Sequence, residues 1–153
     1  LLNFLAFPRY WSGVYNGWTT AALFIILWSS DVGAYCFGTI FGQGEHGHKL
    51  FPSISPKKSW EGIIGGAITA GIAAVILGVT RVLNFSVFGD VIFTFLIFAA
   101  GVYGDLVESQ LKRNFGVKDS GTIMPGHGGM LDRFDSALLA FPVAVIFTLV
   151  CWG

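Results

Sequence analysis

Charge is the first thing that this sequence has little of, because only 12% of its 153 residues are charged and the formal net charge is zero. A neutral chain has no bulk electrostatic attraction for nucleic acid, so no nucleic-acid partner is expected. Hydrophobic residues make up 54% of the chain, glycine occurs 21 times, and the mean hydropathy is +0.69. These values exclude an ordinary soluble domain and are typical of membrane helices, in which glycine is frequent.

Cysteine is also scarce. Cys36 and Cys151 both fall in apolar runs, and their spacing excludes a Cys-x-x-Cys redox motif and a secreted disulfide framework. The chain begins at Leu1 without methionine or the layout of a signal peptide. We therefore expect a single membrane domain, residues 1–153, from which an N-terminal part of a longer protein is missing.

Long apolar runs are abundant, in contrast. A membrane-spanning helix needs about 20 mostly apolar residues. Four stretches meet or approach this length: Trp18–Phe41, Gly62–Leu83, Phe88–Leu111 and Phe134–Trp152. Asp31 interrupts the first stretch, and Asp105 and Glu108 interrupt the third. Acids in such positions are costly and are therefore a functional signal.

The linkers between these runs differ in charge. Seven of the nine basic residues lie in the first and third linkers or at their edges, leaving only Arg9 and Arg81. By the positive-inside rule, these two linkers are cytoplasmic, which places both chain ends on the outer side. We predict an all-α polytopic membrane protein with about four transmembrane helices and a polar cavity that faces the cytoplasm.

The acids of the third run form a polar stripe. Asp105, Glu108 and Lys112 stand at i, i+3 and i+7 on one helical face, and Ser109 extends the stripe. One interpretation is a buried Glu108–Lys112 ion pair that neutralises itself, although it leaves Asp105 without a partner. The other is a pair of carboxylates that holds a divalent cation, since Mg²⁺ often takes one or two carboxylates together with substrate phosphates.

Asp31 poses the same question in the first run. Tyr35 lies one turn away on the same face, and Gly33 and Gly38 permit close helix packing. As a lone acid, Asp31 is compatible with a structural hydrogen bond, a proton relay or a substrate ligand. The residues around it do not choose among these roles.

The first linker has a basic turn. Ser55 directly before Pro56 predicts an N-cap and a helix that begins there. Such a helix offers free N–H groups to an anion, and Lys57 and Lys58 add positive charge, so phosphate is the expected guest. Alternatively, the lysines only fix the topology or touch anionic lipid headgroups.

Two alternating histidines, His46 and His48, precede this turn. The pattern invites a zinc site, but no third or fourth ligand is evident nearby, and a structural zinc ion normally has four. We therefore expect this part of the linker to be a flexible cytoplasmic loop.

The third linker, "KDSGTIMPGHGGMLDRFD", is densely polar. Its glycines permit tight turns and a close approach to a ligand. Asp132 and Asp135 stand at i and i+3 at the start of the last run, where acids can also serve as caps. Capping does not account for the other polar residues of the stretch, which are Lys118, Asp119, His127 and Arg133. Acids for a metal, bases for phosphate and a glycine-rich turn together indicate phosphoryl or nucleotidyl transfer.

The stretch from Ser109 to Asp135 closely resembles the signature of the phosphatidate cytidylyltransferases, or CDP-diacylglycerol synthases. That signature has a serine, a Lys-Arg pair, a Lys-Asp pair, Pro-x-His-Gly-Gly and Asp-Arg-x-Asp, and every polar element is present. Met124 is the one departure, at a position that is usually leucine, isoleucine or phenylalanine. "DVGAYCFG" and "SPKKSWEG" are similar to two further segments of the family, so the resemblance spans Asp31 to Asp135.

The resemblance implies the reaction of CTP with phosphatidate to give CDP-diacylglycerol and pyrophosphate, for phospholipid synthesis. It implies Mg²⁺, with or without a second cation, membrane lipids as partners, a homodimer, and a site at the cytoplasmic face of a bacterial inner membrane. It also implies that this chain is the C-terminal part of the family's fold, without the N-terminal helices that members usually have.

Carried onto matching positions, the resemblance gives each residue a role. The implied metal ligands are Asp105, Glu108 and Asp132. The implied phosphate- or substrate-binding residues are Ser55, Lys57, Lys58, Ser109, Lys112, Arg113, Lys118, His127, Gly128, Gly129 and Arg133. Asp105, Asp132 and Lys118 are the expected catalytic residues, with Asp31 orienting a ligand or completing the metal surroundings. Whether Asp119 and Asp135 touch substrate or only hold the loop is left open.

Two other functions fit parts of the pattern. A related enzyme could use CTP on another lipid phosphate or on a polyprenol, because the sequence does not reveal the acyl-chain pocket. A transporter or proton-coupled channel would also place acids in broken spans. The polar groups gather near one surface instead of at the midplane, which favours the transferase.

Overall fold

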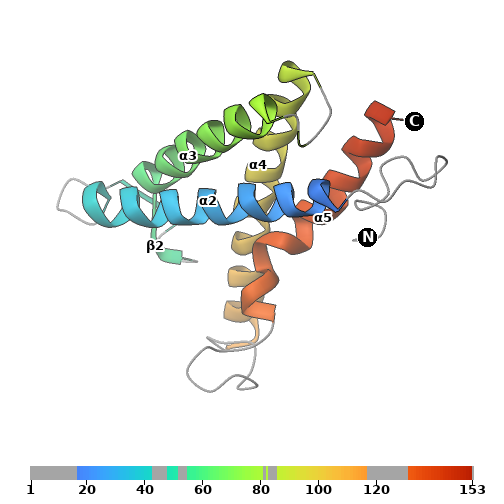
Figure 1. Ribbon diagram of the computed structural model, residues 1–153. Helices are drawn as coiled ribbons and strands as arrows, with labels where there is room; N and C mark the ends of the chain where they lie inside the picture. Colours follow the sequence, from blue (N-terminus) through green and yellow to red (C-terminus); the bar gives the residue numbers. More distant parts are fainter. Residues whose placement is uncertain are drawn as a thin grey trace.

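The computed structural model describes residues 17–42, 48–51, 55–80, 82, 86–116 and 131–152, excluding the side chains of residues 51, 56, 57, 131–133 and 152. Figure 1 shows the elements in this part of the chain. They are α2 (Trp18–Phe41), β1 (Lys49–Phe51), β2 (Ser55–Ser59), α3 (Trp60–Val79), α4 (Val87–Asn114) and α5 (Leu131–Trp152).

The helices confirm the predicted all-α membrane architecture. Within the described residues, four segments are long and apolar enough to cross a membrane: Trp18–Phe41, Trp60–Val79, Val87–Asn114 and Phe134–Cys151. Their bounds differ from the expected runs by a few residues, most at α3, which begins and ends earlier than Gly62–Leu83. Hydropathy alone locates such helices because an apolar bilayer core requires a long apolar segment whose backbone polar groups are paired internally.

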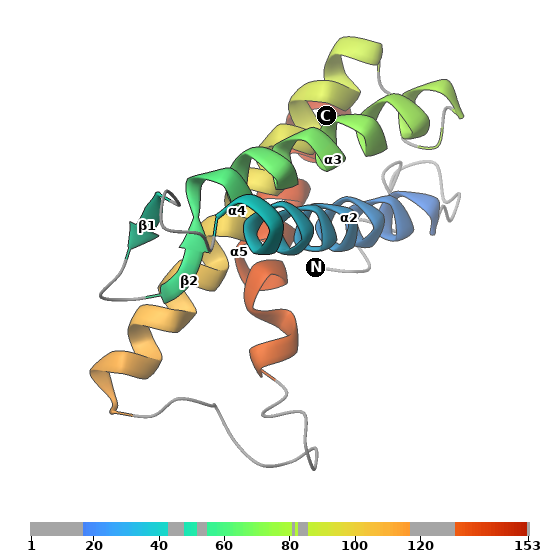
Figure 2. The same cartoon turned by 90° about the vertical axis from the view of Figure 1, so that its left-hand side faces the viewer.

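The helices pack as two antiparallel pairs. α2 packs most extensively on α3 and α4 on α5, while α3 joins the pairs by its contacts with α4. In Figures 1 and 2, α2 runs across α4 and α5. The buried core lies at this crossing and contains Leu23 and Ile26 of α2, Phe93 and Ile97 of α4, and Ala140 of α5. In Figure 1 the C-terminal end of α2 lies beside the start of α3, and the C-terminal end of α4 lies toward the start of α5.

Glycine permits close approach at two helix contacts. A Cβ added at Gly33 of α2 would overlap the side chain of Thr69 in α3, which confirms the packing role expected of Gly33. On α4, a Cβ at Gly104 would stand 2.6 Å from the backbone oxygen of Asp135 in α5. Without a side chain at Gly104, the two backbones come close enough to place Asp105 beside the start of α5.

The basic turn differs from its prediction. Ser55–Ser59 is a strand, β2, paired antiparallel with β1 in the register Lys49 with Ser59 and Phe51 with Ser55. The predicted helix start at Ser55 is therefore wrong, and α3 begins at Trp60 instead. Ser59 is the N-cap, and its Oγ accepts a hydrogen bond from the Gly62 N–H at 3.1 Å.

Both serines suit a cap by residue type, but strand pairing decides between them. The backbone from Ser55 to Ser59 pairs with β1, and the chain is free to turn into a helix only after the last pair. Pro56 is tolerated in a short two-stranded ribbon, where no second neighbour requires its missing N–H. Lys57 and Lys58 therefore lie on a strand and not in the first turn of a helix.

Candidate functional site

A cavity of about 770 Å³ opens where α2, β2, α4 and the first turns of α3 and α5 meet. Its polar lining comes from four elements, α2, β2, α4 and α5, and consists of Ser30, Asp31, Tyr35, Ser55, Lys58, Ser59, Asp105, Asp135 and Ser136. Four of the predicted site residues, Asp31, Ser55, Lys58 and Asp105, line this cavity. That it faces the cytoplasm stays a prediction.

The strongest contact in the cavity joins β2 to α4. Lys58 Nζ lies 2.5 Å from Asp105 Oδ2, and the two side chains are 23% and 33% exposed. The other carboxylate oxygen of Asp105 accepts a hydrogen bond from Ser109 Oγ at 3.3 Å, one turn further along α4. Asp105 therefore has a cationic partner, contrary to the expectation that a Glu108–Lys112 ion pair would leave it alone.

That second ion pair is present as well. Lys112 Nζ lies 3.0 Å from Glu108 Oε1, and the Glu108 side chain is only 3% exposed. Glu108, Ser109 and Lys112 follow Asp105 along α4 but do not line the cavity, and Arg113 is exposed in the last turn. The predicted polar stripe thus divides into Asp105, which faces the cavity, and a buried ion pair behind it. The metal-binding role of Glu108 stays a prediction.

Asp31 projects from the middle of α2 into the same cavity, and Tyr35 lines it one turn later, as their shared helical face predicted. Asp31 is close enough to Asp105, Asp135 and Lys58 to interact with all three electrostatically. The role of Asp31 toward a ligand stays a prediction.

Asp135 is a cavity acid whose role the sequence left open. It lies in the first turns of α5, where its Oδ1 accepts hydrogen bonds from the Ser136 N–H at 2.6 Å and the Ser136 hydroxyl at 3.2 Å. It is also within electrostatic range of Asp105 and Lys112. Its position three residues after Asp132, at the start of an apolar run, was the signal that pointed to it.

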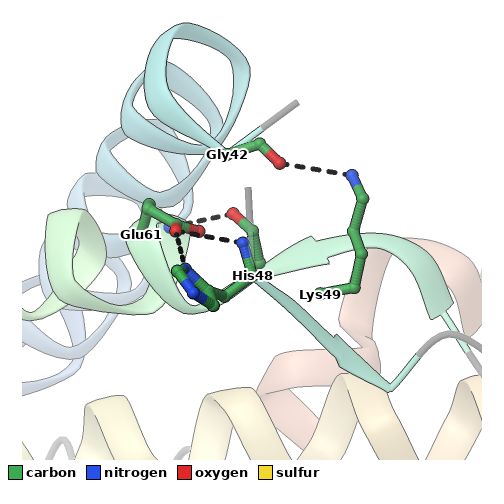
Figure 3. A network of polar contacts seen from close by, with 6 residues as sticks. Gly42, His48, Lys49 and Glu61 are labelled. Carbon is green, nitrogen blue, oxygen red and sulfur yellow. Dashed lines mark hydrogen bonds and ion pairs between the residues drawn. The ribbon is translucent and has the colours of Figure 1, made fainter. Parts of the chain in front are cut away.

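The hairpin of β1 and β2, which carries Ser55 and Lys58, is held against α2 and α3 by polar contacts (Figure 3). Glu61 Oε1, in the first turn of α3, accepts a hydrogen bond from the His48 N–H at 3.1 Å and lies 3.1 Å from His48 Nδ1. Lys49 Nζ donates to the carbonyl oxygen of Gly42, at the end of α2, at 3.2 Å. The expectation of a flexible loop is therefore wrong from His48 onward, because these contacts and the pairing with β2 order the chain. They also set where Lys58 stands.

The remaining predicted residues cannot be placed in the cavity. Lys118, His127, Gly128 and Gly129 lie outside the described residues, as does Asp119. Lys57 lies on β2, and Asp132 and Arg133 lie in the first turn of α5, but their side chains are not among those described. Among the described residues, no three histidine, cysteine or acidic side chains converge as a metal site.

The cavity therefore combines a cation, three carboxylates and the N-terminal end of a helix with an apolar wall. Ser59 and Gly62 of the first turn of α3 line it, so the positive end of the α3 dipole faces the same space. Such a lining can accept a molecule with an anionic head and an apolar body.

Comparison with known proteins decides the family. The family profile described as "Cytidylyltransferase family" matches residues 3–151. The chain belongs to this cytidylyltransferase family. Curated relatives named phosphatidate cytidylyltransferase include those of Staphylococcus saprophyticus and Staphylococcus haemolyticus, each 46% identical over 120 residues, and of Staphylococcus aureus, 47% identical over the same length. Each match covers 78% of this chain and 45% of the relative, so the matched segment spans less than half the length of each of these curated relatives.

Proposed function

We propose that this cytidylyltransferase transfers CMP from CTP to phosphatidate, forming CDP-diacylglycerol and pyrophosphate. The observation that carries the proposal is the meeting of Lys58 with Asp31, Asp105 and Asp135 in one cavity that also has an apolar wall. Cations and carboxylates in such a cavity suit a triphosphate and its counterion, and the apolar wall suits a lipid acceptor. The names of the relatives support the same assignment.

Lys58 is the residue that we assign to phosphate binding inside the cavity. Before substrates bind, Lys58 is paired with Asp105, and each side chain offsets the desolvation of the other. When phosphates enter, their oxygens replace Asp105 as the partner of Lys58, which frees the carboxylate. Ser55 and the N-terminal end of α3 contribute from the same side.

The proposed reaction is an in-line displacement at the α-phosphorus of CTP. An oxygen of the phosphatidate phosphate forms the new bond to this phosphorus, and the bond to the oxygen that bridges to the β-phosphate breaks, releasing pyrophosphate. A phosphate monoester is largely ionised at neutral pH, with a second pKa near 6, so no strong general base is needed. The basic residues stabilise the departing pyrophosphate, and we assign Lys58, Lys112, Arg113, Lys118 and Arg133 to this group of cations.

We also propose a requirement for Mg²⁺. The donor chemistry fits, because Asp31, Asp105 and Asp135 offer hard carboxylate oxygens to one cavity. Since these three do not converge as a complete site, substrate phosphates and the signature acid Asp132 would supply the remaining oxygens. When bound, the ion would neutralise phosphate charge and orient the triphosphate.

The charge of the linkers supports a site that faces the cytoplasm, in a bacterial inner membrane. CTP is a soluble nucleotide and phosphatidate a membrane lipid, so a cavity at the end of membrane-crossing helices can receive both. The homodimer implied by the family resemblance stays a prediction, which crosslinking in native membranes can test.

The test is an assay of the membrane-bound protein with radiolabelled CTP, Mg²⁺ and a panel of acceptors: phosphatidate, an isoprenoid phosphate and a polyprenol. We expect CDP-diacylglycerol from phosphatidate, lost about 100-fold or more in Asp105→Asn and Asp132→Asn. Glu45→Ala, which removes an acid that belongs to none of the motifs shared with the family, should change little. Faster turnover of another acceptor would reassign the substrate, and no nucleotide transfer to any acceptor would reject the enzyme. Ion flux in liposomes without transfer would instead support a transporter.

A further inference from the structure

The cavity extends well beyond its charged end. Its lining on α2 runs from Gly38 through Asp31 to Leu27 and Phe24. At a rise of 1.5 Å per residue, Phe24 stands about 10 Å from Asp31 along the helix axis. On α4, Val102 and Phe98 also line the cavity, N-terminal to Asp105 in the chain. One cavity thus passes from a charged end to an apolar end.

Aromatic rings build the wall of the apolar end. The ring of Phe24 lies between two others, with its centroid 5.7 Å from Trp28 on the same helix and 5.5 Å from Phe141 on α5, in an edge-to-face arrangement. The contact between the rings of Phe24 and Phe141 joins α2 to α5. Trp28 lines the cavity but is still 66% exposed, so it stands at the edge where the cavity meets the outer surface of the helices.

We propose that this apolar end is a subsite for the part of an acyl chain next to the glycerol of the acceptor lipid, and that Phe24 and Trp28 determine which chains it accepts. The proposal rests on the proposed function and names a determinant of acceptor specificity. The occupant follows from continuity: a molecule whose phosphate lies among Lys58 and the carboxylates extends its apolar part toward Phe24. The remainder of the chain leaves past the exposed ring of Trp28 into the surrounding lipid.

The kinetic test compares phosphatidates that differ only in chain length. Burial of one methylene group changes affinity by a factor of about four. Trp28→Ala and Phe24→Ala should therefore raise KM for dipalmitoyl phosphatidate about fivefold or more. KM for dibutyryl phosphatidate, whose chains end early, should change less than twofold, and KM for CTP should stay constant. Phe88→Ala is the matched control, because Phe88 is 76% exposed at the far end of α4 and does not line the cavity.

A binding measurement separates this inference from the proposed reaction. Phosphatidate with bromine atoms on its first acyl carbons should quench tryptophan fluorescence in a saturable way, and Trp28→Phe should lack that component. Brominated phosphatidylcholine reports the non-saturable background. If the protein forms no CDP-lipid but the saturable quenching persists, the reaction is wrong and the subsite stands. Equal KM changes at both chain lengths, or no saturable quenching, would overturn the subsite.

Discussion

At the scale of single residues, the cavity depends on the ion pair between Lys58 and Asp105. Both side chains are partly buried between apolar helices, and each would be costly to desolvate alone. Their 2.5 Å contact joins a strand to a helix from distant parts of the sequence. Such an ion pair can serve the fold by neutralising two partly buried charges. Alternatively, it can hold both side chains in place until substrates bind.

A double-mutant cycle distinguishes these meanings. Lys58→Met leaves the Asp105 carboxylate unpaired and should lower stability by about 1 kcal/mol, since both groups are partly exposed. Adding Asp105→Asn should restore most of that stability, measured as thermal unfolding in detergent. CTP turnover should stay at least 100-fold below wild type in the double variant, because both groups act on substrates. Recovery of turnover together with stability would show that the pair is only structural.

At the scale of elements, the hairpin and the start of α3 act as one unit. Glu61 accepts a hydrogen bond from the His48 N–H, and Lys49 donates one to the carbonyl oxygen of Gly42. Ser59 caps α3 directly after β2. Because Ser55 and Lys58 lie on β2, the position of this strand determines what the cavity presents to a phosphate. The residue that caps α3 is Ser59 and not Ser55, which stays on β2 and lines the cavity. The boundary between β2 and α3 therefore affects the lining of the cavity as well as the start of the helix.

The two serines should behave differently when replaced. Ser59→Ala removes the oxygen that accepts from the Gly62 N–H and should cost about 1 kcal/mol, whereas Ser59→Asp should retain the cap. Ser55→Ala should leave the melting temperature nearly unchanged and act on KM for substrates, as expected for a residue that lines the cavity. Thermal unfolding of the three variants, with kinetics in parallel, is the measurement. A larger loss of stability in Ser55→Ala than in Ser59→Ala would contradict the assignment.

At the scale of the whole molecule, the packing of α4 on α5 brings the acids together. The backbone of Gly104 faces the carbonyl oxygen of Asp135, so Asp105 and Asp135 reach the same cavity from two helices. The neighbours of Gly104 are backbone atoms, which cannot turn aside as a side chain can. Any group added there must move one helix relative to the other.

Gly104→Ala should therefore disturb both stability and activity. Its Cβ would lie 2.6 Å from the Asp135 oxygen and 3.3 Å from the Ser136 Cα, and such overpacking typically costs about 1 to 3 kcal/mol. Turnover should fall at least tenfold as Asp105 and Asp135 separate. Gly71→Ala is the matched control, since its added Cβ would meet no atom within 4 Å, and we expect it to be at least as stable as the wild type. Equal behaviour of the two variants would refute the close contact.

The sequence alone determined the membrane class, the four helices and the residues that resemble the family's motifs. Hydropathy and helical spacing are local properties, so the runs and the shared face of Asp31 with Tyr35 could be predicted. Residue types also identified Lys58 and Asp105 as separate candidates. Only the tertiary structure decided that they pair, that Asp135 joins them, and that Ser59 rather than Ser55 begins α3. Those outcomes depend on which helices cross and how closely their backbones approach, and this is set by packing between residues far apart in the chain.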